Sequence, residues 1–333
     1  MCAQLDSRAV TILDEVGADW DRLAEQSANV FATREWLTLW WERFGEGRRL
    51  IVDEVIDEGR VAAILALYAW RERPLRVLRF LGHGAGDELG PICAPADRPA
   101  AIGALGRLLE RERWDVFVGE QLPGGDHWPD ASVLAREGSP VIRAGGWEEL
   151  LATRSGNFRY QVRSLERKLF ERHDAAYRLA DAATLETDLD ALFRLHAARW
   201  GDRSALGLEQ EAFLREFATV ALARGWLRLW LLDVDGAPCA AWCGFRFANV
   251  EAYYQSGREP AWDGSSVGLV LLAHSIRAAL ADGVVEYRLL RGSEPYKYRF
   301  ATADPGLQTV ARPRGVLGTV VLGGARFVRR LRR

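Results

Sequence analysis

The pattern of apolar and polar positions along the chain predicts alternating helices and strands. Over Thr33–Phe44, apolar residues recur three and four positions apart, the spacing of one buried helix face, and Thr33 is a suitable N-cap. The apolar runs Leu50–Ile56 and Val61–Trp70 flank Asp57-Glu58-Gly59, which indicates a β-hairpin. We therefore expect the tryptophans of the helix to face a core.

The two halves of the sequence predict the same order of elements. The first half predicts a strand at Val10–Leu13, two helices, three strands, a glycine- and proline-rich loop, a helix and a strand. The second half predicts a basic helix over Asn157–His173 and then the same series. That series covers Ala175–Ala180, Leu185–Trp200, Glu209–Arg224, Trp226–Val234, Cys239–Phe247, Val250–Gln255, Val267–Asp282 and Val284–Leu290. The repetition indicates an internal duplication of a mixed α/β unit.

The expected domain boundaries follow from this repetition. The segment Leu122–Pro140 contains several glycines and prolines, as linkers do. We expect one unit over residues 1–140, a second over 141–312 and a basic tail over 313–333. Each unit is expected to be a central mixed sheet flanked by helices, so the predicted fold class is α/β, with the mixed sheets of an α+β arrangement.

Composition excludes several classes of protein. The 333 residues carry a net charge of −2, which gives no support to a nucleic-acid binder as a whole, although a local basic patch remains compatible with it. We expect no DNA partner. The N-terminus lacks the pattern of a secretory signal, and no apolar run reaches the ~18 to 20 residues of a membrane span. The four cysteines are too few and too scattered for a disulfide framework, which favours the cytoplasm.

Two clusters in the second half have the residue types that binding and catalysis need. Ser265–Gly268 opens a predicted helix, where unpaired backbone N–H groups and the helix dipole favour an anion such as a pyrophosphate. The alternative is an ordinary capped helix. Arg291, Glu294, Tyr296 and Lys297 follow a predicted buried strand, where ligands bind in open α/β sheets. The alternative there is a surface Glu/Lys pair beside a core tyrosine.

Most of the chain resembles the GNAT acyltransferase superfamily, in particular its CelD/BcsL-type acetyltransferase branch. The residues that carry this resemblance are Trp36-Leu37, Trp40-Trp41, Phe44-Gly45, Phe193-Arg194-Leu195-His196, Arg199-Trp200, Tyr253–Gly257, Ser265–Gly268 and Glu286–Lys297. The resemblance implies two tandem GNAT-like units, the first degenerate, and transfer of an acyl group from acetyl-CoA or another acyl-CoA directly to an amine. The acceptor expected is a small molecule or a cell-envelope or polysaccharide precursor.

The resemblance implies a role for each candidate residue. The pyrophosphate of acyl-CoA would lie at Ser265, Ser266, Val267 and Gly268. Tyr296 would protonate the leaving thiolate or orient the acceptor, Lys297 would stabilise the oxyanion, and Glu294 would act as the base, directly or through water. Tyr254, Arg291 and Asp263 would line the acceptor site. The sequence departs from the family pattern at two places. The segment Ser265–Gly268 lacks the full Gln/Arg-x-x-Gly-x-Gly/Ala pattern of the phosphate-binding loop, and Arg288 replaces an acidic residue that is usual in the branch.

Other readings of the sequence remain open. Fem-type aminoacyl-tRNA-dependent transferases also pair two such units, and the basic Asn157–His173 helix is compatible with them, as it is with a solvated basic face. A non-catalytic GNAT-like binding protein is the third reading.

The seven arginines of Arg312–Arg333, with no acid, indicate weak contact with a membrane surface or an unattached terminus. We predict no metal site, because Cys239 and Cys243 have no histidine nearby. The sequence predicts no oligomeric state.

Overall fold

The computed structural model describes residues 6–10, 17–201 and 206–331, and it divides the chain into two compact units. The first unit comprises residues 1–138 and 305–333, and the second comprises residues 139–304. Residues 305–312, which we expected in the second unit, therefore lie in the first. Of the strand predicted at Val10–Leu13, the part after residue 10 lies outside the described residues.

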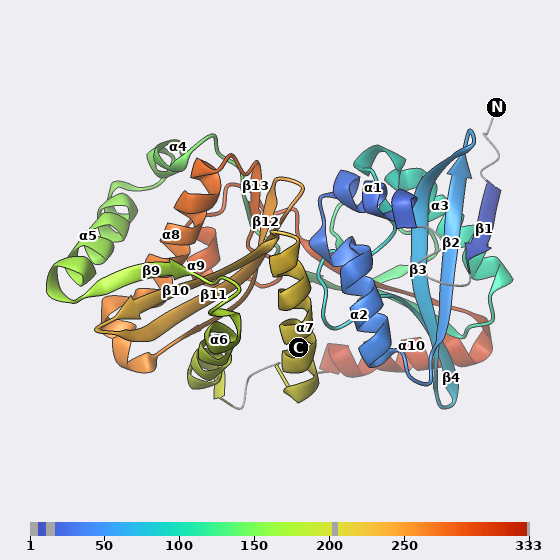
Figure 1. Cartoon of the computed structure of the whole chain (residues 1–333). Helices are drawn as coiled ribbons and strands as arrows, with labels where there is room; N and C mark the ends of the chain where they lie inside the picture. Colours follow the sequence, from blue (N-terminus) through green and yellow to red (C-terminus); the bar gives the residue numbers. More distant parts are fainter. Residues whose placement is uncertain (1–5, 11–16, 202–205, 332–333) are drawn as a thin grey trace. The chain divides into compact units, whose positions relative to one another are not determined.

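The described strands of the first unit form one mixed sheet with helices on both faces (Figure 1). The sheet order is β1 (Asp6–Val10), β2 (Arg49–Asp57), β3 (Arg60–Glu72), β4 (Leu75–Phe80), β6 (Val116–Pro123), β14 (Leu307–Pro313) and β7 (Ser132–Glu137), while β5 (Ile92–Cys93) pairs with β3. Its helices are α1 (Gly17–Ser27), α2 (Arg34–Phe44), α3 (Arg98–Arg111) and α10 (Gly315–Leu331). β4 and β6 run parallel, and the other pairs are antiparallel.

The buried tryptophans confirm the helix predicted in the first unit. Thr33 caps α2 by accepting a hydrogen bond from the Trp36 backbone N–H. Trp36 and Trp40 are fully buried, and the Trp40 ring lies 5.3 Å from that of Tyr68 on β3. The neighbouring Leu67 packs instead with α3 on the opposite face of the sheet, because successive strand residues point to opposite sides.

The described strands of the second unit form a second mixed sheet (Figure 1). Its order is β8 (Val141–Ile142), β13 (Glu286–Arg288), β12 (Val250–Arg258), β11 (Ala237–Phe247), β10 (Leu227–Val234) and β9 (Ala175–Leu179). Its helices are α4 (Trp147–Ala152), α5 (Gly156–Arg172), α6 (Leu185–Trp200), α7 (Leu208–Ala223), α8 (Val267–Ala281) and α9 (Pro295–Tyr298). One core packs α4, α5 and α8 against the sheet, and α6 and α7 pack against β10, β11 and β12.

The two sheets share one topology, which confirms the predicted mixed α/β fold. In each unit three antiparallel strands are followed by a helix and a strand that runs parallel to the third. These segments are β2-β3-β4-α3-β6 and β10-β11-β12-α8-β13. The parallel pairing is short in both, and in the second unit it joins only Val250–Ala252 to Glu286–Arg288.

The sequence analysis missed three strands of the first unit. The two-residue β5 lies in the predicted glycine- and proline-rich loop, and the other two, β7 and β14, have non-local partners. β7 lies inside the segment expected to be a linker, and β14 joins the sheet from the far end of the chain by pairing with β6 and β7. Most of the expected tail is the helix α10. None of the helices in the described part of the chain combines the length and low polarity that a transmembrane segment needs.

Candidate active site

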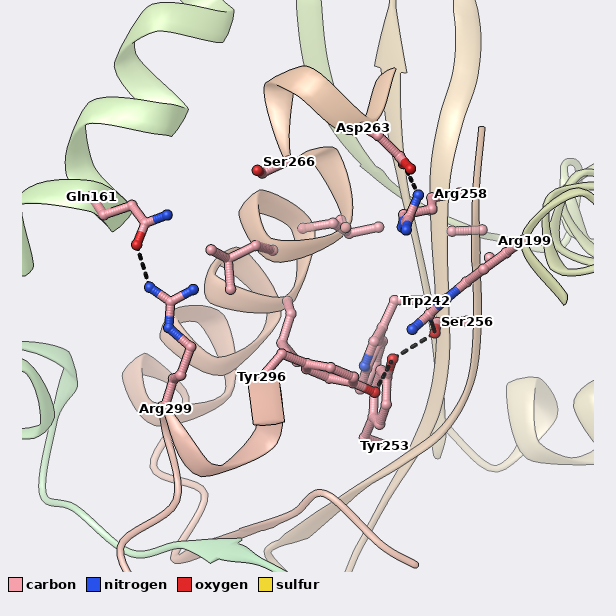
Figure 2. Close-up of a pocket in the computed structure, with 16 residues that line it drawn as sticks. Gln161, Arg199, Trp242, Tyr253, Ser256, Arg258, Asp263, Ser266, Tyr296 and Arg299 are labelled. Carbon is pink, nitrogen blue, oxygen red and sulfur yellow. Dashed lines mark hydrogen bonds and ion pairs between the residues drawn. The ribbon is translucent and has the colours of Figure 1, made fainter. Parts of the chain in front are cut away.

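A cavity of about 330 Å³ lies in the second unit along the last half of β12. β12 pairs with β13 only as far as Ala252, so the later residues of β12 have no strand beside them on that side. The cavity is bounded by β12, by the start of α8 and by Tyr296 of α9 (Figure 2). Its volume falls within the range of small-molecule sites.

A β-bulge determines which tyrosine of β12 faces the cavity. Gly244 pairs with Tyr253 and Cys243 pairs with Gln255, so Tyr254 is the extra residue. Tyr253 lines the cavity, whereas the Tyr254 ring packs 5.8 Å from Phe245 and does not line it. We expected Tyr254 at the substrate site, but the structure places its neighbour there.

The start of α8 forms the polar end of the cavity. Ser266 has a left-handed backbone (φ 53°), and its side chain makes no capping bond within the described structure. Ser266 and Gly268 line the cavity, and a Cβ on Gly268 would lie 3.1 Å from the side chain of Arg258. The first N–H groups of an α-helix lack intrahelical partners, so this end can bind an anion. Val267 is instead fully buried, and Ser265 lies outside the cavity lining.

Arg258 and Asp263 form an ion pair at the same end (Figure 2). Both residues line the cavity, and Asp263 is the one carboxylate among its described lining residues. Burial, followed by repulsion from Arg199, lowers the pKa of Arg258. The wall of the cavity thus brings two guanidinium groups close together, which favours a negatively charged or strongly polar ligand.

A chain of hydroxyl groups crosses the floor of the cavity (Figure 2). The Tyr296 hydroxyl donates to that of Tyr253 at 3.4 Å, and the Tyr253 hydroxyl lies 2.5 Å from Ser256 Oγ. Arg199 Nη1 donates to the same Ser256 oxygen at 2.9 Å. Burial, and then the proximity of Tyr253, raise the pKa of Tyr296 well above its usual range. Tyr296 therefore keeps its proton at neutral pH, and its hydroxyl can act as a hydrogen-bond donor in the cavity.

The indole of Trp242 supplies a further donor. Its Nε1–H is buried without a hydrogen-bond acceptor among the described residues, and Trp242 lines the cavity. Buried polar groups are nearly always satisfied, so an unpaired donor beside a cavity fits a ligand that brings an acceptor such as a carbonyl oxygen.

Lys297 and Glu294 do not line the cavity. The Lys297 side chain is buried, and its Nζ donates to the carbonyl oxygens of Arg291 at 2.6 Å and Leu290 at 3.4 Å. Glu294 lies 3.0 Å from the same ammonium. Leu290 and Gly292 have positive φ values of 55° and 124°, so Lys297 stabilises the turn between β13 and α9. Arg291 is exposed on this turn and also lies outside the cavity lining.

The structure thus brings together part of the predicted site and adds residues that the sequence analysis did not assign. Asp263, Ser266, Gly268 and Tyr296 meet at the cavity, whereas Tyr254, Ser265, Val267, Arg291, Glu294 and Lys297 do not line it. The unassigned lining residues that carry polar chemistry are Gln161, Arg199, Trp242, Tyr253, Ser256, Arg258 and Arg299. Arg199, Tyr253 and Ser256 belong to motifs that carry the family resemblance, which was the available signal.

The histidines and cysteines of the second unit are structural. His196 Nδ1–H donates to the Ser256 carbonyl at 3.0 Å, and burial lowers the pKa of this imidazole. His274 stacks on Tyr177 at 3.6 Å, and burial lowers its pKa to about 4. Cys239 and Cys243 are buried, and burial raises the pKa of each to about 12. Within the described residues, no cluster of histidine, cysteine or acidic side chains could hold a metal ion.

The comparison with known families decides what kind of domain surrounds this cavity. Residues 156–298 match the family model of the acetyltransferase (GNAT) domain. This segment is a GNAT domain. It holds the residues named at the cavity except Arg299, and it lies within the second unit. The narrower resemblance to the CelD/BcsL branch stays a prediction. No curated protein is significantly similar to the chain in sequence.

Solved structures extend the likeness to both units. FemX aligns with 92% of this chain and 97% of its own at 10% identity, with a TM-score of 0.65. The C-terminal domain of a putative lysylphosphatidylglycerol synthetase from Agrobacterium fabrum aligns with 94% and 96% at 9% identity and a TM-score of 0.58. A tandem GNAT protein from the clavulanic acid biosynthesis pathway aligns with 94% and 99% at 13% identity and a TM-score of 0.51. At these identities the likeness establishes the tandem GNAT-like fold alone.

Proposed function

We propose that the chain is an N-acyltransferase that uses acyl-CoA and an amine acceptor. One observation carries the proposal: a single cavity of the GNAT domain is lined both by the N-terminus of α8 and by the protonated phenol of Tyr296. The N-terminus of α8 can bind the diphosphate of a nucleotide, and the phenol of Tyr296 can protonate a leaving group.

The residues at the start of α8 fit acyl-CoA, which would supply an activated acyl thioester. Ser266 and Gly268, with the backbone of Ser265 and Val267, would hold the pyrophosphate. A Cβ on Gly264 would meet no atom within 4 Å, so the approach to this end is open. The unpaired Trp242 indole N–H lies at the cavity wall, where it can hold a carbonyl oxygen.

Tyr296 and Asp263 divide the proton transfers in this proposal. Tyr296 gives its phenolic proton to the leaving sulfur, and the Arg199 guanidinium, 5.8 Å from its ring, stabilises the negative charge that develops. Asp263, in place of Glu294, is the carboxylate that can take the proton of the amine through water, because Asp263 lines the cavity and Glu294 does not. Lys297 acts as a positioning residue for the turn before α9.

The test is an acyl-transfer assay with acetyl-CoA, a longer acyl-CoA and a mixture of amino sugars, amino acids and polyamines. We expect release of free CoA thiol that requires both donor and amine, together with an acylated amine detected by mass spectrometry. Thiol release without an acylated product would indicate hydrolysis and contradict N-acyl transfer.

A Fem-type aminoacyl-tRNA-dependent transfer is the second candidate, and the basic helix α5 favours it. Lys168 and Arg172 are exposed there, whereas Arg163 pairs with Glu148 at 2.6 Å and Arg167 with Glu171 at 4.0 Å. This candidate predicts tRNA binding that weakens as salt rises, with no response to acyl-CoA. A protein that binds neither donor would fit the non-catalytic alternative.

A further inference from the structure

The first unit has a groove of about 580 Å³ that is lined mainly by arginines. It lies among the segment between α2 and β2, the β3–β4 hairpin and the end of α3. Its charged lining residues are Arg48, Arg49, Arg71, Arg76, Arg111, Arg113 and Glu112. The function proposed for the second unit does not involve this groove.

Acidic side chains compensate only half of these arginines. Arg49 pairs with Glu112, Arg76 with Asp115 at 3.0 Å and Arg111 with Asp53 at 2.7 Å. The other three, Arg48, Arg71 and Arg113, form no ion pair among the described residues, although Arg71 lies near enough to Asp115 to help lower the pKa of that carboxyl. Three guanidinium groups without an ion pair in one groove favour a ligand with several negative charges.

Aromatic rings hold one of these arginines in place. The Arg48 guanidinium carbon lies 5.4, 4.8 and 5.5 Å from the ring centres of Trp40, Tyr68 and Trp70. Trp70 lines the groove and is 37% exposed. Tryptophan is enriched at membrane–water interfaces, and arginine is enriched on the cytoplasmic side of membranes.

Helix α10 begins directly beside this groove. Asp115, which holds Arg76, presents its carbonyl to Gly318 of α10 so closely that a Cβ there would lie 2.0 Å away. Arg314, just before α10, donates to the carbonyls of Leu109 and Glu112 at the end of α3. The groove and α10 are thus neighbouring parts of the first unit, as the β3–β4 hairpin and α10 are in Figure 1.

One side of α10 is apolar and faces solvent. Leu322 is buried in a small cluster with Val116 and Ala311, whereas Val316 and Val320 are 83% and 64% exposed. Leu317 and Val321 are exposed as well. Residues 305–333 contain seven arginines and no acid. An apolar helix side within a strongly basic segment is typical of helices that lie in the membrane interface.

We infer that the first unit docks on an anionic lipid surface through the arginine groove and the exposed side of α10. Lipid phosphates would occupy the groove, and Val316 and Val320 would enter the interface. A nucleic acid would use the arginines but leave the apolar side of α10 in water. A second copy of this chain, with its net charge of −2, offers little charge complementarity. A membrane satisfies both features at once.

The test is co-sedimentation of the full chain with vesicles of phosphatidylcholine alone or with 30% phosphatidylglycerol. We expect binding only to the anionic vesicles, weakening as salt rises. Arg71→Glu with Arg113→Glu should weaken it at least about 30-fold, and Val316→Asp with Val320→Asp about 100-fold. All four positions are exposed, so the variants should fold normally, which circular dichroism can check.

Matched variants in the second unit provide the controls. Lys168→Glu with Arg172→Glu makes the same change in net charge, and Leu208→Asp adds a charge at an apolar residue that is 85% exposed. Both should bind vesicles as the wild type does. Equal loss in these controls, or no binding to anionic vesicles, would overturn the inference. So would binding of a fluorescent ribo-oligonucleotide in place of vesicles, or a dimer in sedimentation velocity that Val316→Asp with Val320→Asp dissociates.

Discussion

Replacing Tyr296 by phenylalanine is expected to lower kcat for acyl transfer by about 100- to 1,000-fold. The change removes the proton that the raised pKa keeps on the phenol, together with one long hydrogen bond to Tyr253. Stability should fall by only about 0.5 to 1 kcal/mol. Affinity for acyl-CoA should change little, because the α8 end of the cavity is untouched. Steady-state kinetics and thermal unfolding measure the two effects separately.

Tyr298 provides a matched control for this variant. It lies in the same short helix, but its hydroxyl donates to Asp304 at 2.6 Å and its side chain is exposed rather than lining the cavity. Tyr298→Phe should therefore leave kcat near the wild-type value. Wild-type kcat in Tyr296→Phe, or an equal loss in both variants, would exclude Tyr296 as the proton donor.

Replacing Lys297 by methionine is expected to destabilise the second unit by about 2 to 3 kcal/mol. The change leaves the carbonyls of Leu290 and Arg291 and the carboxylate of Glu294 without their cation. Glu294 is partly exposed, so water compensates some of this loss. For a unit of this size the unfolding midpoint should fall by about 5 to 10 °C. Lys297→Arg should not restore it, because the planar guanidinium is larger than the buried ammonium that it replaces and has a different geometry.

This prediction separates a positioning lysine from an oxyanion-stabilising one. If Lys297 acted only on the reacting atoms, its substitution would lower kcat and leave the unfolding midpoint of the protein unchanged. Lys168, the other lysine of the chain, is exposed on α5, and Lys168→Met should leave both quantities unchanged. An unchanged midpoint in Lys297→Met would contradict the structural role assigned here.

The elements that depend on neighbouring residues could be predicted from the sequence. Thr33 caps α2, and Asp57-Glu58-Gly59 turns the β2–β3 hairpin, because both signals are contained within a few positions. β14 could not be predicted in the same way. Its pairing joins Leu307 to Pro123, which are separated by more than half the length of the chain. No local pattern encodes such a partner.

The same distinction between local and distant determinants applies to the residues of the cavity. Ser266 and Gly268 were predicted because a helix start is a local feature, and the structure places both in the lining. Lys297 was predicted there because it follows a buried strand. Its direction depends on the left-handed residues Leu290 and Gly292, which turn the chain so that the Lys297 ammonium meets the carbonyl oxygens of Leu290 and Arg291. Arg199 reaches the cavity from α6, and nothing in its own segment shows that β12 will lie opposite.

The most direct test of the central claim, that the cavity of the GNAT domain holds acyl-CoA, is thermal unfolding with acetyl-CoA and with free CoA. At ~100 times its dissociation constant a ligand adds about 2.7 kcal/mol to the folded state, which predicts a midpoint about 5 to 10 °C higher. Gly268→Leu, which fills the α8 end of the cavity, should abolish this shift. Gly103→Leu, at an exposed and open position of α3, should keep it. No shift with either ligand, or the same shift in Gly268→Leu, would contradict the account.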